Sequence, residues 1–405
     1  MKPLRPVILG AFGPPTLACL RSWGRAGLAP GLIAVRGPGE PRPASKYLAG
    51  SVCLSRDDLY TERGLEIILR FLNDFDASGL TCIDENIAQW LNEQRPNLPT
   101  NIPLWLPPSA MLRRVLDKAA QIEAARRVGL TVLPTWLFSS AAMDEEIPAD
   151  CFPLCLRPAA PGAVEPTFKV QNVASTEELR AFLAAREFRG QVIGQPFRNL
   201  PNLVVHGTRT AAGETLGMAG FLVERKFQGV TLTLRPTVLS DDFKARCVAF
   251  TEAMDLVGHY HFEFLADGAT GENHFLEINH RFGGTTAKVL VCGYPEPLYA
   301  LRAQGFDLPV QAEERSVTVS SLKALGKSAY FALRGRLTAL DYPEESTARR
   351  LWSTVKCLAT CRDEVFAWDD LPGTAAFYFG NIPARLNGAT ASCRKQWTAI
   401  RAKSR

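Results

Sequence analysis

The sequence predicts a mixed fold, in which an α/β lobe at the N-terminus is followed by α+β lobes. The chain has 405 residues, which exceeds the usual size of one domain, so two or three lobes are expected. Apolar runs at 7–10 and 32–35 flank a helical spacing of apolar residues over 14–26, which is a βαβ opening. From 152 to 229 the pattern changes to short strands, with one helix at 176–185.

The first lobe has the pattern of an α/β sheet without a dinucleotide site. Segment 10–15 lacks the three-glycine phosphate turn and places two prolines where the helix should begin, so we expect a structural role. A helix is predicted at 63–74 and a strand at 79–83. Asp84 and Glu85 follow this strand, where they could face a ligand, but capping of the next helix is the preferred interpretation.

A proline-rich stretch separates the first lobe from the rest of the chain. Five prolines between 96 and 108 exclude a continuous helix, so the first boundary is placed after residue 108. A single helix is predicted over 109–128, with Lys118 near its middle. Short strands are expected at 168–170, 203–208 and 217–223, among others.

Two strands at 259–265 and 274–278, joined by a glycine-containing turn, form the most informative hairpin. Alternation with period two places Glu277 and Asn279 on one face and directs Leu276 and Ile278 into the core. Pairing of the strands can bring Glu263 beside them. An all-oxygen cluster of this kind suits a hard cation such as Mg²⁺.

Arg281 continues on the same face, where a fixed cation can neutralise charge on a phosphoryl group or a tetrahedral intermediate. The small residues 283–286 that follow offer backbone N–H groups to a substrate or a phosphate. The alternative is an ion-pair ladder across a surface hairpin. The apolar neighbours argue against it, because buried carboxylates require a cation or a full set of hydrogen bonds.

Composition narrows the class of protein. A formal net charge of +5, with only residues 394–405 locally basic, gives no reason to expect a nucleic-acid partner. No apolar run approaches the ~20 residues that span a bilayer, so no membrane association is expected. Ten cysteines without a secretory leader favour reduced thiols in the cytoplasm, and the paired spacings Cys151/Cys155 and Cys357/Cys361 are interpreted as core thiols rather than zinc ligands.

The hairpin pattern, Glu263 followed by Glu277-Ile-Asn279 and Arg281, resembles the signature of the ATP-grasp superfamily. Segments 45–47 and 81–85 are similar to the carboxylate–amine ligase subgroup, which includes D-aspartate ligase-like and carbamoyl-phosphate-synthase-like proteins. The resemblance implies a Rossmann-like pre-ATP-grasp lobe, a small lid lobe and a metal-binding C-terminal lobe. The implied division is 1–108, then 109–310 with a lid at about 150–230, then an extension or small domain at 311–405.

The resemblance also implies roles for individual residues. Glu263, Glu277 and Asn279 would bind Mg²⁺ or Mn²⁺, and Arg281 would be catalytic, stabilising an acyl-phosphate step. The side chains implied in ATP binding are Lys118, Arg157, Lys169, Gln195 and Phe197.

Several positions depart from the family pattern. Arg157 stands where a lysine is usual, and its planar fork must contact phosphate differently. Gln195 replaces a common glutamate beside the adenine, and Asn202 replaces an acidic ribose ligand found in some relatives. His280 replaces a proline and is expected to point away from the substrate.

Structural roles are expected for other polar side chains near these motifs. Arg225 and Lys226 could bind a substrate carboxylate, but a plain surface pair is preferred. For His259 and His261, structural hydrogen bonding is expected.

The function implied by the resemblance is ATP-dependent ligation. ATP would phosphorylate a carboxylate, and an amine would attack the acyl phosphate to form an amide, with release of ADP and phosphate. The substrates would be small molecules, most naturally amino acids, and a homodimer is possible. Two alternatives stay open: a bicarbonate-activating, N-carboxylating enzyme, and a degenerate ATP-binding protein without turnover.

Overall fold

The computed structural model describes residues 3–40, 42–142, 146–310, 312–313 and 315–380. The locally basic segment 394–405 lies outside this part of the chain. Two compact units are formed, one by Met1–Leu106 together with Asp363–Arg405 and the other by Pro107–Arg362. The division into three domains stays a prediction. Among the described residues, no helix has both the length and the apolar character needed to cross a bilayer.

The first unit contains a four-stranded parallel sheet, as the βαβ opening predicts. In sheet order its strands are β3 (Gly50–Ser55), β2 (Gly31–Arg36), β1 (Pro6–Gly10) and β4 (Gly79–Cys82). Its helices in this part of the chain are α1 (Pro14–Arg25), α2 (Glu62–Asp74), α3 (Glu85–Glu93) and the 3-10 turn η1 (Arg95–Asn97). The side chain of Asp84 accepts hydrogen bonds from the amides of Asn86 and Ile87, which confirms the capping interpretation.

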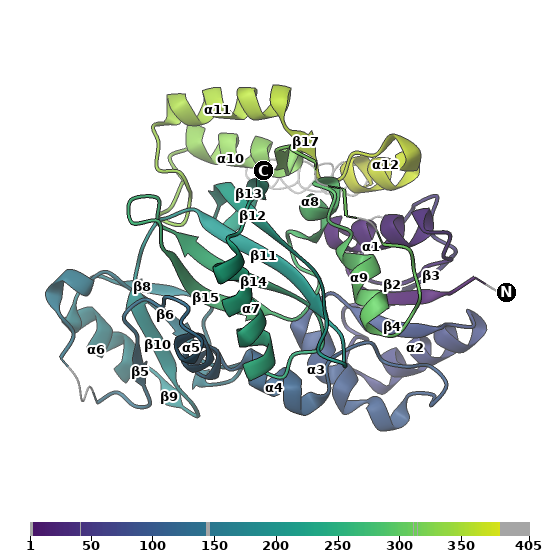
Figure 1. Cartoon of the computed structure of the whole chain (residues 1–405), viewed down its shortest axis with the longest axis horizontal. Helices are drawn as coiled ribbons and strands as arrows, with labels where there is room; N and C mark the ends of the chain where they lie inside the picture. Colours follow the sequence, from purple (N-terminus) through teal and green to yellow (C-terminus); the bar gives the residue numbers. More distant parts are fainter. Residues whose placement is uncertain (1–2, 41, 143–145, 311, 314, 381–405) are drawn as a thin grey trace, which may run out of the picture. The chain divides into compact units, whose positions relative to one another are not determined.

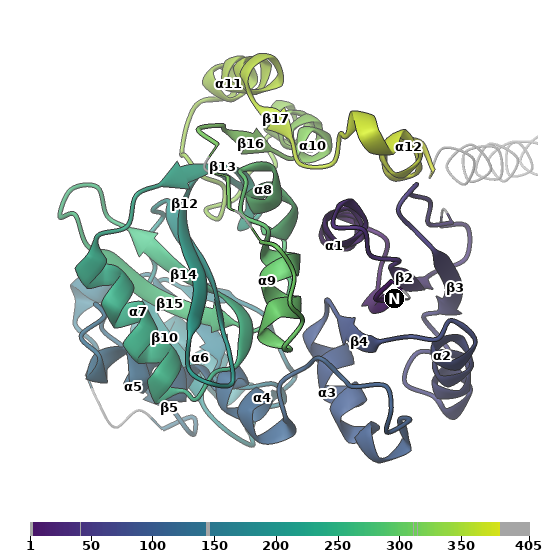
Figure 2. The same ribbon diagram turned by 45° about the vertical axis from the view of Figure 1, so that its right-hand side comes forward.

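The chain returns to this first unit near its C-terminus. After β17 (Arg362–Asp363) comes the 3-10 turn η3 (Trp368–Asp370), which leads into α12 (Leu371–Phe379). Figure 2 shows α12 beside α1. Asp370 has no exposed surface and accepts a hydrogen bond from Arg21 of α1 at 2.8 Å, so a buried ion pair holds the returning segment.

The single helix predicted at 109–128 is wrong in one respect, because two helices occupy this segment. These are α4 (Ser109–Leu116) and α5 (Lys118–Arg127), separated by Asp117 in an extended conformation. The Asp117 carboxylate accepts hydrogen bonds from the amides of Ala119 and Ala120, so it starts a new helix instead of continuing the old one. Lys118 is therefore the first residue of α5.

The second unit is built on one seven-stranded and one four-stranded sheet (Figure 1). The seven-stranded sheet has the order β15 (Asn273–Asn279), β14 (Gly258–Ala266), β11 (Asn202–Arg209), β12 (Thr215–Phe227), β13 (Val230–Thr237), β16 (Val319–Ser320) and β17. The four-stranded sheet has the order β5 (Trp136–Phe138), β10 (Val192–Pro196), β6 (Leu154–Pro158) and β8 (Gln171–Val173). The strands predicted at 203–208 and 217–223 thus belong to the large sheet. The strand predicted at 168–170 is instead an irregular connection.

The remaining elements of the second unit complete these sheets. A short ribbon pairs β7 (Val164–Glu165) with β9 (Glu187–Phe188). The helical elements are η2 (Ala149–Cys151), α6 (Thr176–Ala184), α7 (Asp241–Ala253), α8 (Thr286–Val291), α9 (Glu296–Ala303), α10 (Leu322–Leu333) and α11 (Thr347–Thr360). The α6 helix confirms the helix predicted at 176–185, and it begins after Ser175, whose side chain accepts a hydrogen bond from the Glu178 amide.

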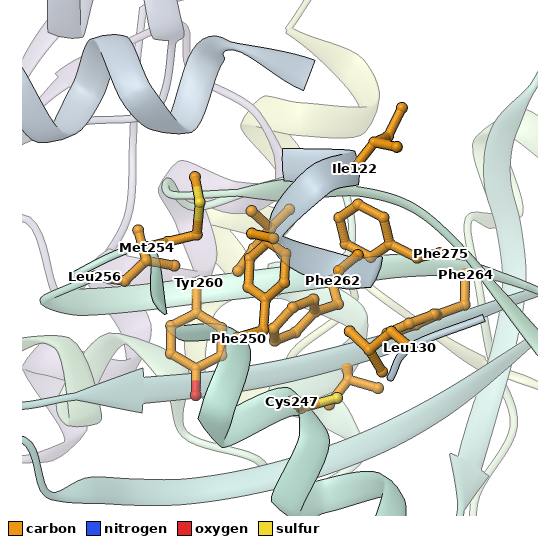
Figure 3. Packing of buried hydrophobic residues seen from close by; sticks show 14 of the residues in the cluster. Ile122, Leu130, Cys247, Phe250, Met254, Leu256, Tyr260, Phe262, Phe264 and Phe275 are labelled. Atoms are coloured by element: carbon orange, nitrogen blue, oxygen red, sulfur yellow. The ribbon is translucent and has the colours of Figure 1, made fainter. Parts of the chain in front are cut away.

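The main core of the second unit lies between α5, α7 and the strands β14 and β15 (Figure 3). Phe262 of β14 and Phe275 of β15 pack against Phe250 of α7, and Phe264 of β14 packs against Phe275; all four side chains have no exposed surface. Burial of each ring contributes on the order of 2 kcal/mol. Because side chains alternate along a strand, this core leaves the opposite face of the hairpin to polar residues.

Candidate active site

The β14–β15 hairpin places its acidic side chains on one face. Glu263 lies directly opposite Glu277, and His261 lies opposite Asn279. The prediction that pairing brings the three oxygen-bearing side chains together is therefore confirmed. Their role in metal binding stays a prediction.

The predicted alternation fails at one residue, because β15 is bulged. The register shifts between Glu263 and Phe264, so Phe264 pairs with Phe275 and Leu276 becomes the extra residue. Leu276 is only half-buried, and Phe275 takes the core position that the period-two pattern assigns to Leu276. Ile278 points into the core as predicted.

A buried glutamine holds α5 against β15. The Gln121 side chain donates to the carbonyl of Ile278 at 3.2 Å and accepts from the Ile278 amide at 2.9 Å. Lys118 lies three residues earlier on the same helix, and side chains three apart share a helix face. Its Nζ accordingly reaches Glu277 Oε2 at 3.2 Å. Gln121 was not predicted from the sequence, because its partner Ile278 lies 157 positions away.

Arg157 enters the same cluster from β6 of the four-stranded sheet. Its Nη1 lies 3.7 Å from Glu277 Oε2, and its Nη2 donates to Gln195 Oε1 at 2.8 Å. The Gln195 amide in turn donates to Thr135 Oγ1 at 3.0 Å. Arg157 and Gln195, two of the side chains that depart from the family pattern, are thus bound to each other. A glutamate in place of Gln195 would lack the N–H that Thr135 accepts.

A buried lysine, Lys226, is linked to Glu263 through the side chain of Asn202. Lys226 Nζ donates to Leu200 O at 2.7 Å and to Asn202 Oδ1 at 3.2 Å, and Asn202 Nδ2 donates to Glu263 Oε2 at 3.2 Å. Burial lowers the pKa of Lys226 to about 8. The interpretation of Arg225 and Lys226 as a plain surface pair is wrong, since both are buried and Arg225 forms an ion pair with Glu345.

The two facing carboxylates differ in their electrostatics. Burial and the neighbouring Glu277 charge raise the pKa of Glu263. Burial would also raise the pKa of Glu277, but Lys118 and Arg157 outweigh it and lower that pKa. The neighbouring cations thus stabilise the charged form of Glu277 more than that of Glu263. With the Asn279 amide on the same face, this donor set fits a hard divalent cation.

Cation binding should therefore depend on pH. Burial and the Glu277 charge raise the pKa of Glu263 to about 7, so protons compete with Mg²⁺ at this carboxylate below that pH. We expect the apparent Kd for Mg²⁺, measured calorimetrically, to be flat above pH 8 and to rise about tenfold per unit below pH 6. Glu263→Gln should bind more weakly and lose this dependence. A Kd that stays constant from pH 5 to pH 8 would contradict the assignment.

The other predicted site residues lie at different places in the second unit. Arg281 follows β15 directly, and its charge lowers the pKa of Glu263 against the effects of burial and Glu277, so it stands close to that carboxylate. Phe197 follows β10, where its amide donates to Pro153 O at 2.8 Å. Lys169 is exposed in the connection between β7 and β8. Among the described ion pairs, those of Glu277 involve Lys118 and Arg157 rather than Lys169.

His259, His261 and His280 at the hairpin are buried, whereas His274 is half-buried. His259 stacks on Phe282 with ring centroids 3.9 Å apart, and burial lowers its pKa to about 3. His280 contacts the Val257 carbonyl, in keeping with the expectation that it points away from a substrate. His261 has 3% exposure, and burial lowers its pKa well below the ordinary value.

The sequence matches no protein-family model and no curated protein, whereas many solved structures resemble the fold. A biotin carboxylase complex with β-γ-ATP from Campylobacter jejuni has 17% identity and a TM-score of 0.60, over 77% of this chain and 73% of that one. An L-amino acid ligase from Bacillus licheniformis has 14% identity and a TM-score of 0.56, over 78% and 79%.

An ADP complex of N5-carboxyaminoimidazole ribonucleotide synthetase covers more of this chain. It has 14% identity and a TM-score of 0.59, over 89% of this chain and 98% of that one. These likenesses concern the fold. The chain has the ATP-grasp fold, which confirms the fold class that its hairpin pattern predicts.

Proposed function

We propose that this protein is an ATP-dependent ligase that activates a carboxylate as an acyl phosphate and joins it to an amine. The observation that carries the proposal is the cluster at the hairpin. Glu263, Glu277 and Asn279 share one face, while Lys118 and Arg157 reach Glu277 from α5 and β6. Carboxylates, an amide and cations meeting at one point suit a nucleotide triphosphate bound with a divalent cation.

Each group then has a role that follows from its chemistry. Glu263, Glu277 and Asn279 would hold Mg²⁺ or Mn²⁺, which neutralises phosphate charge when bound. Lys118 and Arg157 would contact the phosphates, and Arg281 would stabilise negative charge on the reacting carboxyl group. Gln195 and Phe197 would lie beside the base, and Lys169 would reach the nucleotide from its connection. Catalysis then consists of positioning and charge neutralisation, without a protein nucleophile.

The products of ATP cleavage test this scheme. Purified protein is incubated with Mg²⁺, ATP, and pools of amino acids and small carboxylic acids. Phosphate release is measured first, and the products are then identified by mass spectrometry. We expect ADP and phosphate only when the correct carboxylate is present, and an amide when the amine is added. Formation of AMP and pyrophosphate would overturn the acyl-phosphate scheme.

A second candidate is activation of bicarbonate for N-carboxylation. The structural likeness to a biotin carboxylase and to N5-carboxyaminoimidazole ribonucleotide synthetase favours it. The likeness to an L-amino acid ligase favours amide formation instead. ADP release that requires added bicarbonate in degassed buffer would select the second candidate.

A degenerate ATP-binding protein is the remaining alternative. The charged groups around Glu277 argue against it, because a binder without turnover does not need cations on both sides of a metal-binding carboxylate. We infer amino acids as the most natural substrates, and a homodimer in the cytoplasm as the working form. The described cysteines, all of them free thiols, support that compartment.

A further inference from the structure

A buried polar cluster lies next to the hairpin and joins segment 283–286 to two residues, His206 and Glu296, that have no role in the predicted site. It consists of His206 on β11, Glu296 at the start of α9, and Thr285 and Thr286 just before and at the start of α8. His206 Nδ1 lies 2.8 Å from Glu296 Oε1, and its Nε2 lies 2.9 Å from Thr285 Oγ1. Thr286 Oγ1 donates to Glu296 Oε2 at 2.7 Å. Both carboxylate oxygens and both ring nitrogens therefore have partners.

Burial of a carboxylate costs free energy unless cations or hydrogen bonds compensate its charge, so we ask what this cluster does for the protein. Glu296 and His206 have no exposed surface, and neither belongs to the proposed nucleotide site. Burial alone would raise the pKa of Glu296, but the His206 ring and the Thr286 hydroxyl outweigh it and lower that pKa. Glu296 is thus a charged group in the core, with all its bonds directed at His206 and at one short segment.

That segment is residues 281–286, here called the arginine loop, which runs from Arg281 to Thr286. Its two threonines are held by the buried pair, and Thr286 Oγ1 also accepts from the Gly283 amide at 2.9 Å. The ring of His261 packs closely against the loop at Gly283. A Cβ at this position would lie 2.6 Å from His261 Cε1, so only glycine fits there without a shift of the ring. Gly284 is exposed, with nothing within 4 Å of the position a Cβ would take.

A metal centre is the other chemistry that this cluster suggests. Ligand atoms of His206, His261 and Glu296 lie within 4.8 Å of one another. However, the hydrogen bonds to Glu296 and Thr285 already occupy both nitrogens of His206, and the two imidazole rings stack at an interplanar angle of 19°. Stacked rings direct their in-plane lone pairs along similar lines, which does not suit convergence on one ion. The geometry favours a hydrogen-bonded support.

We propose that the His206–Glu296 pair is a positioning device that fixes the arginine loop, so that Arg281 and the exposed backbone at Gly284 together hold the carboxylate of the substrate. The inference rests on the proposed function, because it concerns the substrate that this function activates. The buried pair does not touch the substrate. It acts through the hydroxyl groups of Thr285 and Thr286, which form hydrogen bonds to His206 and Glu296.

The hydroxyl groups can be removed with little change of shape. Thr285→Val and Thr286→Val delete one oxygen each, and Thr285→Ser and Thr286→Ser are matched controls that keep it. Hydrogen exchange of the amides in 281–286 is measured by mass spectrometry, together with the Kd for MgADP. We expect at least tenfold faster exchange of this segment in the valine variants, near-normal exchange in the serine variants, and an MgADP Kd within about twofold of the unchanged protein.

Steady-state kinetics then separates positioning from general damage. With the carboxylate found in the product screen, its KM should rise about tenfold or more in the valine variants, while the KM for ATP stays the same. Glu296→Gln, which keeps the shape of the side chain but not its charge, should also speed hydrogen exchange of 281–286 and raise the KM for the carboxylate. Unchanged exchange of 281–286, equal damage in serine and valine variants, or a parallel loss of MgADP binding would overturn the positioning role. If the unchanged protein ligates nothing, the proposed function fails, and the exchange and MgADP measurements still decide whether the pair fixes the loop.

Discussion

Glu277→Gln is expected to lower Mg²⁺ affinity by at least about 100-fold and to reduce ligation by about a thousandfold. The substitution keeps the size of the side chain but removes its charge. Lys118 Nζ lies 3.2 Å and Arg157 Nη1 lies 3.7 Å from Glu277 Oε2. Without the carboxylate charge, these two cations would repel each other. The loss therefore combines a missing cation ligand with two cations displaced from the position where phosphate oxygens should lie.

The hairpin offers a matched control for this experiment. Glu272 precedes β15 in the turn, and its side chain is 52% exposed, so Glu272→Gln should change neither Mg²⁺ affinity nor turnover. Calorimetric titration with Mg²⁺ and with MgADP, followed by the phosphate-release assay, measures both effects. Retention of Mg²⁺ affinity in Glu277→Gln would rule out this carboxylate as a cation ligand, whatever happens to activity.

The hairpin was predictable because its information is local. Alternation fixes which side chains of two adjacent strands share a face, and the turn between them fixes the pairing. Prediction failed where a single residue breaks the regular pattern. Asp117 ends one helix and starts another by capping, and Leu276 is displaced by a bulge that periodicity does not reveal. Both departures lie within two residues of a predicted site residue, and the first puts Lys118 at the start of α5.

The supporting residues were missed for a different reason, since their partners are distant in the chain. Gln121 meets Ile278 across 157 positions, and His206 meets Glu296 across 90. Neither contact leaves a spacing or composition signal in a single sequence. A buried glutamate at the start of a helix has the same local pattern as an exposed one. Only the fold reveals that Glu296 lies in the core.

The buried ion pair between Arg21 and Asp370 is another long-range contact, and we expect its loss to have a large effect on stability. Asp370→Ala should destabilise the first unit by about 3–5 kcal/mol, because the substitution leaves Arg21 buried without its carboxylate. The side chains of Arg21 and Asp370 are 5% and 0% exposed. Asp370 also accepts from Ser45 Oγ at 2.9 Å and from the Lys46 amide at 2.8 Å.

The neighbouring aspartate provides the control. Asp369 pairs with Arg25 at 2.8 Å, but these side chains are 41% and 42% exposed, so Asp369→Ala should cost less than about 1 kcal/mol. Urea unfolding of both variants measures the difference, and MgADP binding reports whether the second unit is intact. Equal stability of the two variants would show that the buried pair contributes no more than the exposed one.

The pH dependence of the Asp370 effect has a definite sign. Burial would raise the pKa of Asp370, but the hydrogen bonds from Arg21 and from the Lys46 amide outweigh it and lower that pKa from its ordinary value of 3.8. A carboxyl group with a lowered pKa in the folded state stabilises the protein above the ordinary value and loses that contribution as it is protonated. The stability gap between the unchanged protein and Asp370→Ala should therefore be full at pH 7 and shrink below about pH 4. A gap that persists unchanged in acid would mean that Asp370 acts through its shape and not through its charge.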